Sequence, residues 1–187
     1  NKNWEAIFDR LIAIRRNEGI RFKFVMQVDT MSHKIPRFID KAAEAGCNRV
    51  FIGLENVNPD NLAAANKVQN RVDEYRTMLQ AWRSRGVLTY AGYILGLPGD
   101  TPESIERDIR LIQRELPVDI LEFMMLTPLP GSADHKALHE SGAWMEPDLN
   151  RYDLEHVTSR HPRMTADQWQ AVYDRAWHLY YSPEHVA

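Results

Sequence analysis

Two loops rich in glycine and proline are the segments of this 187-residue sequence best suited to hold a ligand. The first runs over 96–103 (Gly-Leu-Pro-Gly-Asp-Thr-Pro-Glu) and the second over 128–132 (Pro-Leu-Pro-Gly-Ser), and each follows an apolar, β-like run. Where parallel strands alternate with helices, ligands bind at the carboxyl ends of the strands. We therefore expect both loops around one opening with Asp29 and Glu55, although plain turns explain Pro-Gly pairs about equally well.

Glu55 is the most informative carboxylate, because it ends a buried apolar strand where an unpaired charge is costly. A ligand would offset that cost, and so would a helix N-terminus or a salt bridge. Gly92, Gly96 and Gly99 lack a Cβ and so allow close approach of a flat or bulky ligand. A phosphate loop is not expected, since no Lys-Ser or Lys-Thr follows these glycines.

The histidines and the single cysteine give weaker signals. His135 and His139 lie four residues apart on a predicted helix, a spacing that can hold zinc, but the pattern positions no third ligand. Solvated helix histidines are the better interpretation. Cys47 follows a helix end and is interpreted as a small buried apolar residue. We assign no catalytic residue and no metal ligand from these patterns.

The composition excludes several classes of partner. The 26 acidic and 23 basic residues are scattered, so a nucleic-acid partner is not predicted. No window reaches the roughly 18 to 20 apolar residues of a membrane span. One cysteine and a polar amino-terminal segment predict a reducing, cytoplasmic location.

Hydrophobic periodicity predicts alternating helices and strands. The helices are expected over about 3–18, 36–46, 72–86 and 101–116, and the strands over 22–28, 48–54, 87–97 and 120–126. The fold class is therefore α/β: a partial (β/α) barrel with about four parallel strands and outer helices over residues 1–132. Residues 133–187 form a C-terminal helical extension, whose last helix is opened by a capping box at Thr165–Gln168 and carries an aromatic packing stripe.

Four strands are fewer than a closed barrel or a doubly wound sheet requires, so we expect a truncated protein that lacks its first strands. The outer edge of the first strand would then present unpaired backbone groups. We expect a loop or a second copy of the chain to cover it, and a homo-oligomer through this strand edge is one form of that expectation.

These features together resemble the radical SAM enzymes, in particular the branch that often carries an N-terminal cobalamin-binding domain. The resemblance rests on four segments in order: Ala45–Glu55, Asn66-Lys67, Gly92–Thr101 and Pro128–Ser132. It covers roughly residues 20 to 140, and the four strands are similar to the third to sixth strands of that family's six-stranded partial barrel.

The resemblance implies roles for individual residues. Gly92, Ile94 and Gly96 match a G-x-I-x-G strand that contacts adenine, although Gly99 stands where the motif often ends in Glu. Glu55 resembles a residue that meets the ribose or methionyl end of S-adenosylmethionine (SAM). Lys67 stands at a frequently basic position, and Leu129 would lie near the adenine. These six residues, Glu55, Lys67, Gly92, Ile94, Gly96 and Leu129, are the predicted cofactor-binding set.

The family's chemistry needs three cysteine thiolates that hold a [4Fe-4S] cluster, which cleaves SAM reductively. The CxxxCxxC segment belongs to a strand that this chain lacks, so the resemblance implies the C-terminal part of a radical SAM oxidoreductase or transferase, inert alone. The missing N-terminal part of the polypeptide is its expected partner, cobalamin a cofactor that the resemblance allows, and the small-molecule substrate is unknown.

Two alternatives belong to other classes. One is a non-catalytic binding or assembly domain with a degenerate barrel, whose aromatic C-terminal helix packs on a partner. The other is a metal-dependent barrel hydrolase that uses His135, His139 and a carboxylate. Cluster cysteines upstream of Asn1 would favour the radical SAM interpretation over both.

Overall fold

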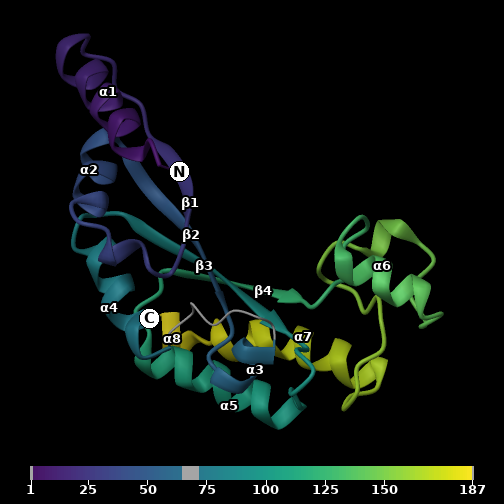
Figure 1. Ribbon diagram of the computed structural model, residues 1–187. Helices are drawn as coiled ribbons and strands as arrows, with labels where there is room; N and C mark the ends of the chain where they lie inside the picture. Colours follow the sequence, from purple (N-terminus) through teal and green to yellow (C-terminus); the bar gives the residue numbers. More distant parts are fainter. Residues whose placement is uncertain (1, 65–71, 187) are drawn as a thin grey trace. The chain divides into compact units, whose positions relative to one another are not determined.

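The computed structural model describes residues 2–64 and 72–186, which divide into two compact units (Figure 1). The first unit comprises Asn1–Leu54, Val68–Gly92 and Leu116–Glu122, and the second comprises Glu55–Lys67, Tyr93–Glu115 and Phe123–Ala187. Each unit is described below by itself. The boundary after residue 132, which was drawn from a change in sequence pattern, stays a prediction.

Four parallel strands form one sheet in the order β1-β2-β3-β4, which confirms the partial (β/α) barrel. They are β1 (Phe24–Val28), β2 (Cys47–Glu55), β3 (Leu88–Leu95) and β4 (Ile120–Met125). In β2 every second residue from Val50 to Leu54 is fully buried, which is the alternation of a strand with one face packed under helices. β1 pairs with β2 and lies at the end of the described strand order.

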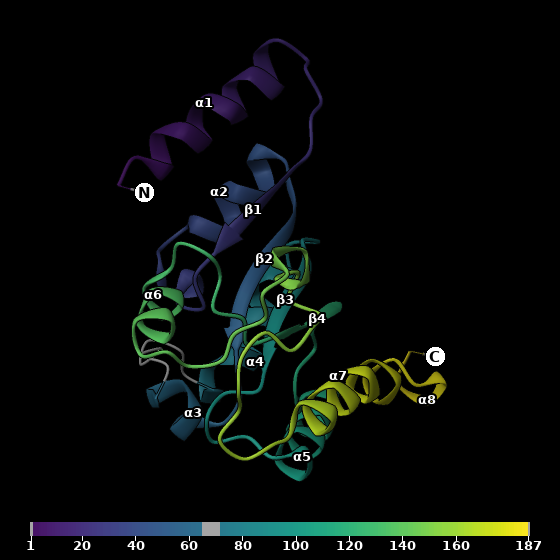
Figure 2. The ribbon, with the colours of Figure 1, turned by 90° about the vertical axis from the view of Figure 1, so that its right-hand side faces the viewer.

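The first unit packs α1 (Trp4–Asn17), α2 (Phe38–Ala45), the 3-10 helix η1 (Ser32–Lys34) and α4 (Val72–Arg83) with β1 and the starts of the other strands. Figures 1 and 2 both show α1 beside α2. The Phe38 ring joins these elements, because its centroid lies 5.0 Å from that of Trp4 and 6.0 Å from that of Trp82. Trp82 is fully buried, and its Nε1 donates to Ser32 Oγ at 3.2 Å.

The second unit contains α3 (Pro59–Ala64), α5 (Pro102–Glu115), α6 (Ala133–Glu140), the 3-10 helix η2 (Leu149–Arg151), α7 (Ala166–Tyr180) and α8 (Pro183–Val186). Helices α5 and α7 lie side by side in both views (Figures 1 and 2). Gln113 on α5 fixes the end of α7, since its Nε2 donates to the carbonyls of Leu179 and Tyr180. The predicted capping box of α7 is present in full at Thr165 and Gln168.

One local expectation was wrong, and two further segments contain short helices. Pro36 does not start a helix: η1 precedes it, and α2 begins at Phe38 after Arg37, which has φ +62°. The Pro59-Asp60 pair begins α3, as proline's fixed φ allows in a first helical turn. The polar segment from Asp148 to His161 contains η2, and Met145 bridges to Ser159.

In the described part of the chain, no helix combines the length and the apolar character that crossing a bilayer demands. The longest, α7, has 15 residues and carries charged residues on its exposed side.

Candidate functional site

Glu55 is the last residue of β2 and the first residue of the second unit. Its backbone conformation could not be predicted from the sequence. Glu55 is half-buried and has φ +64°, in the left-handed region that residues with a side chain seldom occupy. Such a conformation costs about 1 kcal/mol or more and is found disproportionately at functional sites. Glu55 is therefore held in an unfavourable backbone conformation at the end of β2.

The next residue connects the end of β2 to β3. Asn56 is 1% exposed, and its Nδ2 lies 3.5 Å from the carbonyl oxygen of Ile94. Its Oδ1 accepts from the Asn58 backbone N–H at 2.7 Å, which fixes the amide orientation. The structure thus joins Asn56, the residue that follows Glu55, to the Ile94 carbonyl, and the binding role of Glu55 and Ile94 stays a prediction.

The end of β4 joins the same strand ends. The Leu126 N–H donates to the Leu95 carbonyl at 2.9 Å, so β3 and β4 are still adjacent where they end. Leu129 follows in the next loop and is 46% exposed. Ile94 is half-buried in β3. Ile94 and Leu129 are therefore partly accessible apolar residues at or just after the ends of β3 and β4.

The loop after β3 is closed by its own aspartate. Asp100 is 1% exposed, and its Oδ2 accepts from the backbone N–H groups of Gly96 and Leu97 at 2.9 Å each. Its Oδ1 accepts from Asn61 Nδ2 at 2.6 Å. Burial raises the pKa of Asp100, and these hydrogen bonds oppose that rise. Because the carboxylate takes both N–H groups, they do not serve as an anion cradle, which agrees with the absence of a phosphate-loop sequence.

Two glycines in this loop pack closely against side chains of the protein itself. Gly96 has φ +94°, and a Cβ there would lie 2.2 Å from Cε2 of Trp169. A Cβ on Gly99 would lie 2.4 Å from Oδ1 of Asn61. The expectation that these two glycines leave room for a ligand was therefore wrong in its reason, because α7 and α3 use that space. Whether Gly96 also contacts a cofactor stays a prediction.

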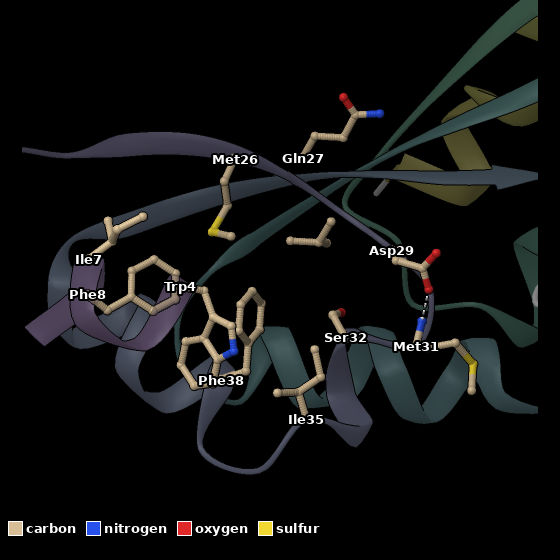
Figure 3. Close-up of a pocket in the computed structure, with 11 residues that line it drawn as sticks. Trp4, Ile7, Phe8, Met26, Gln27, Asp29, Met31, Ser32, Ile35 and Phe38 are labelled. Atoms are coloured by element: carbon tan, nitrogen blue, oxygen red, sulfur yellow. Dashed lines mark hydrogen bonds between the residues drawn. The ribbon is translucent and has the colours of Figure 1, made fainter. Parts of the chain in front are cut away.

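The remaining predicted residues are distributed elsewhere. Lys67 and Asn66 lie outside the described residues. Gly92 is buried in β3 and belongs to the first unit. Asp29 also belongs to the first unit, where its Oδ1 accepts from the Met31 N–H at 2.7 Å and so caps a turn (Figure 3).

Cys47 does not fit the role of a cluster ligand. It begins β2, is 4% exposed, and its Sγ donates to the Arg49 carbonyl at 3.3 Å. Burial raises the pKa of its thiol to about 11, opposed by that backbone hydrogen bond, whereas a cluster requires thiolates. The interpretation of Cys47 as a buried small residue is confirmed.

The histidine pair forms no evident metal centre. The His135 ring packs edge-on to Tyr152 at 6.0 Å between centroids, and His139 is exposed near the end of α6. Among residues 2–64 and 72–186, no three His, Cys, Asp or Glu side chains are grouped as metal ligands would be.

The sequence did not indicate three side chains that contact the loop at the end of β3 (residues 95–100, the β3 loop): His161, Arg163 and Trp169. Trp169 was predicted only as part of an apolar stripe on α7, and it is indeed 1% exposed. Its Nε1 donates to the Leu95 carbonyl at 3.2 Å. The capping box at Thr165 gave the start of the helix, but no local pattern indicates which distant carbonyl an indole N–H will reach.

The chain is similar to curated methyltransferases along most of its length. It is 26% identical over 178 residues to bacteriochlorophyllide d C-8(2)-methyltransferase of Chlorobaculum tepidum, which covers 87% of this chain and 38% of that protein. It is 24% identical over 178 residues to hopanoid C-2 methylase of Rhodopseudomonas palustris, which covers 95% of this chain and 32% of that protein. The chain thus spans less than two-fifths of the length of these relatives.

Two solved structures with a similar fold are each named as a radical SAM protein. TsrM of Kitasatospora setae, a radical S-adenosylmethionine methyltransferase solved with cobalamin and a [4Fe-4S] cluster, matches 97% of this chain and 41% of its own, with TM-score 0.70 and 17% identity. HemN of Escherichia coli, a coproporphyrinogen III oxidase, matches 92% of this chain and 36% of its own, with TM-score 0.63 and 21% identity. At these identities the likeness shows the fold.

The decisive comparison is with a family model. Residues 1–112 match the model described as Radical SAM superfamily, which is more than half of the chain and includes β1 to β3. The superfamily consists of enzymes that use SAM and a [4Fe-4S] cluster. The chain belongs to the radical SAM superfamily.

Proposed function

We propose that this chain is the C-terminal part of the barrel of a radical SAM enzyme that transfers a methyl group to a small-molecule substrate. The observation that carries the proposal is the half-buried Glu55 at the end of β2, whose backbone is left-handed and whose neighbour Asn56 contacts the Ile94 carbonyl, in a chain that belongs to this superfamily. The curated relatives are named as methyltransferases or methylases, which favours transferase chemistry over the oxidoreductase alternative. The substrate stays undefined.

The residues present divide the binding of SAM between them. Glu55 offers a carboxylate to the hydroxyls or the ammonium group, and Ile94, Gly96 and Leu129 offer apolar surface and backbone to the adenine. Lys67 and Gly92 complete the proposed set. When bound, the [4Fe-4S] cluster supplies the electron that cleaves SAM reductively. A cobalamin-binding domain is proposed as well, because the TsrM structure, which matches nearly all of this chain, contains cobalamin.

We further propose that the cluster cysteines lie in a preceding part of the same polypeptide, which packs against β1. A cavity of about 490 Å³ lies in the first unit beside β1, and Trp4, Phe8, Met26, Ile35 and Phe38 line much of it (Figure 3). β1 pairs with β2 and with no other described strand, so its second edge is available for pairing. A further strand with apolar side chains would both pair with β1 and fill this cavity.

This proposal includes two subordinate statements. The chain by itself is catalytically inert, because its one cysteine is buried and protonated. The complete enzyme works in the reducing cytoplasm, where the cluster is stable. A homo-oligomer through the β1 edge is the competing way to cover the same surface, and it predicts a dimer of the complete protein that an added charge on exposed Val25 disrupts.

The first experiment measures SAM cleavage by the complete, anaerobically reconstituted protein. Under a strong reductant, the wild type should release 5′-deoxyadenosine or transfer a labelled methyl group. Glu55→Gln removes the charge but keeps the size, and should raise the KM for SAM roughly tenfold to a hundredfold, since a hydrogen bond to a charged group contributes about 1.5–3 kcal/mol. Glu140→Gln, at an exposed position on α6, is the matched control and should change nothing.

The second experiment locates the cluster. Cys47→Ala in the complete protein should leave the iron content and the iron-sulfur absorbance unchanged, because Cys47 is not a ligand. The isolated 187-residue chain should form no cluster under the same conditions. An iron-sulfur band from this chain alone would contradict the proposal. A complete protein without iron or SAM cleavage would instead favour the binding or assembly domain.

A further inference from the structure

One short segment before and within α7 binds the β3 loop at three regularly spaced points. Trp169 Nε1 donates to the Leu95 carbonyl at 3.2 Å, and His161 Nε2 to the Leu97 carbonyl at 3.0 Å. Arg163 NH1 donates to the Gly99 carbonyl at 3.0 Å. Three side chains within nine residues thus reach every second carbonyl along Leu95–Gly99, so segment 161–169 follows the loop along its length.

The tautomer of His161 makes its contact directional. Its Nδ1 accepts from the backbone N–H groups of Arg163 at 3.0 Å and Met164 at 3.1 Å. The ring proton therefore sits on Nε2 and is donated to Leu97. The ring also packs against Trp169 at 5.2 Å between centroids. The backbone of 163–164 fixes the imidazole, and the imidazole in turn fixes the loop.

Trp169 adds a steric constraint to its hydrogen bond. Its indole fills the space where Gly96 would carry a Cβ, so ring and backbone are in direct contact. From within the loop, Asp100 takes the N–H groups of Gly96 and Leu97. The polar backbone groups of this loop are therefore bonded on one side by Asp100 and on the other by segment 161–169, which leaves the loop little freedom to rearrange.

We propose that His161, Arg163 and Trp169 are positioning residues that hold the β3 loop, and with it Ile94, in the conformation that binds the adenosyl part of SAM. This inference rests on the proposed function. A loop that is already ordered loses less conformational freedom when a ligand binds, so the contacts increase affinity without touching the ligand. Disrupting them should weaken SAM binding more than it slows the chemical step.

The test uses the complete, cluster-loaded enzyme and two variants that remove a hydrogen-bond donor with little effect on packing. Trp169→Phe keeps a ring against Gly96 but removes the N–H, and Arg163→Ala removes an exposed side chain with little effect on packing. Each should raise the KM and the equilibrium dissociation constant for SAM roughly threefold to tenfold, with kcat within about twofold and iron content unchanged. Arg163→Lys, which keeps a donor, should recover part of the loss.

Arg160→Ala provides the control, because Arg160 is exposed, lies three residues before Arg163 and is just outside segment 161–169. It should behave as the wild type does. If the wild type cleaves SAM but Arg163→Ala and Trp169→Phe match the control in KM, the positioning role is wrong and the proposed function stands. If kcat and iron content fall with KM unchanged, the contacts are only structural. A loaded wild type that neither binds nor cleaves SAM overturns both proposals.

Discussion

The β1 edge of the first unit and the β3 loop of the second unit differ in how completely their groups are satisfied. Beside β1, aromatic and aliphatic side chains line a cavity of about 490 Å³, and Val25 is 57% exposed (Figure 3). Along the β3 loop, the three carbonyls at 95, 97 and 99 accept side-chain hydrogen bonds, and Gly96 is in contact with an indole.

Under the proposed function, this difference separates a surface that a preceding part of the polypeptide covers from a loop whose conformation is fixed before a ligand binds. Apolar side chains around a cavity lose dispersion contacts, and we propose that a preceding part of the polypeptide packs there. Backbone groups of the β3 loop that are already hydrogen-bonded are not free to bind a ligand. Their hydrogen bonds instead fix the conformation of the loop. The first unit therefore informs us about assembly, and the second about binding.

The largest expected effect tests the packing of the β3 loop. Gly96→Ala would place a Cβ 2.2 Å from Trp169 at a residue with φ +94°. Backbone strain and overpacking together should lower the free energy of unfolding by roughly 3–5 kcal/mol. Urea unfolding followed by tryptophan fluorescence measures this loss.

Gly131 offers a matched control for the backbone term. It has φ +88°, and a Cβ there would meet nothing within 4 Å. Gly131→Ala should therefore cost only about 1 kcal/mol. Equal losses at the two glycines would show that Trp169 does not constrain Gly96, and the contrast between a fixed loop and ordinary turns would fail.

A second, smaller effect concerns a buried carboxylate on α5. Asp108 is 5% exposed, and burial raises its pKa from 3.8 to about 6, with Arg107 opposing the rise and Asp100 adding to it. Its Oδ2 is buried and lacks a hydrogen-bond partner among the described side chains and backbone. Asp108 is therefore one place in the second unit where a polar group is not satisfied.

The sign of the pH dependence follows from the raised pKa. Below 3.8 both states hold the proton, and between 3.8 and about 6 only the folded state keeps it, so stability falls as pH rises through this range. Asp108→Asn should remove that loss and raise the free energy of unfolding by roughly 2–3 kcal/mol at pH 8, at about 1.4 kcal/mol per pKa unit. It should have little effect at pH 4.

The matched control is Asp174→Asn at an exposed position on α7. It should leave stability unchanged at both values of pH. If Asp108→Asn destabilises the protein at pH 8, then the carboxylate is charged and paired in the folded state. The Asp108 carboxylate would in that case be hydrogen-bonded or ion-paired as fully as the Asp100 carboxylate is.

The fold could be predicted from the sequence because its signals are local. The apolar run at Val50–Leu54 and the Thr101-Pro102 helix start depend on neighbours within a few residues, and both elements lie where they were expected. Pro36 misled us because proline fits a first helical turn and a preceding loop equally well. The left-handed Arg37 that separates η1 from α2 has no signature in residue type.

The candidate site could be predicted only in part, for a related reason. The sequence indicated that Glu55 ends a strand, but not that its backbone is left-handed. It identified Gly96 as special and gave the wrong occupant, because an indole 73 residues later fills the space. Contacts between Leu95–Gly99 and 161–169 join segments more than 60 residues apart, and periodicity carries no information about such pairs.

The smallest expected effect tests whether the start of α7 contributes to the fixed state of the β3 loop. Thr165 Oγ1 accepts from the Gln168 N–H at 3.2 Å, and Gln168 Oε1 accepts from the Thr165 N–H at 3.0 Å. Thr165→Ala removes the first of these bonds and should cost about 1 kcal/mol, whereas Thr165→Ser should restore most of it.

The location of that loss distinguishes the two units more sharply than its size. Because Trp169 lies one helical turn after Thr165, fraying of α7 should loosen the loop, and the Gly96 and Leu97 amides should exchange hydrogen faster in Thr165→Ala. Amides of β1 in the first unit should keep their wild-type rates. Faster exchange in both regions by the same factor would mean that the substitution lowers global stability alone. The loop would then owe its order to the whole fold and not to the segment that contacts it.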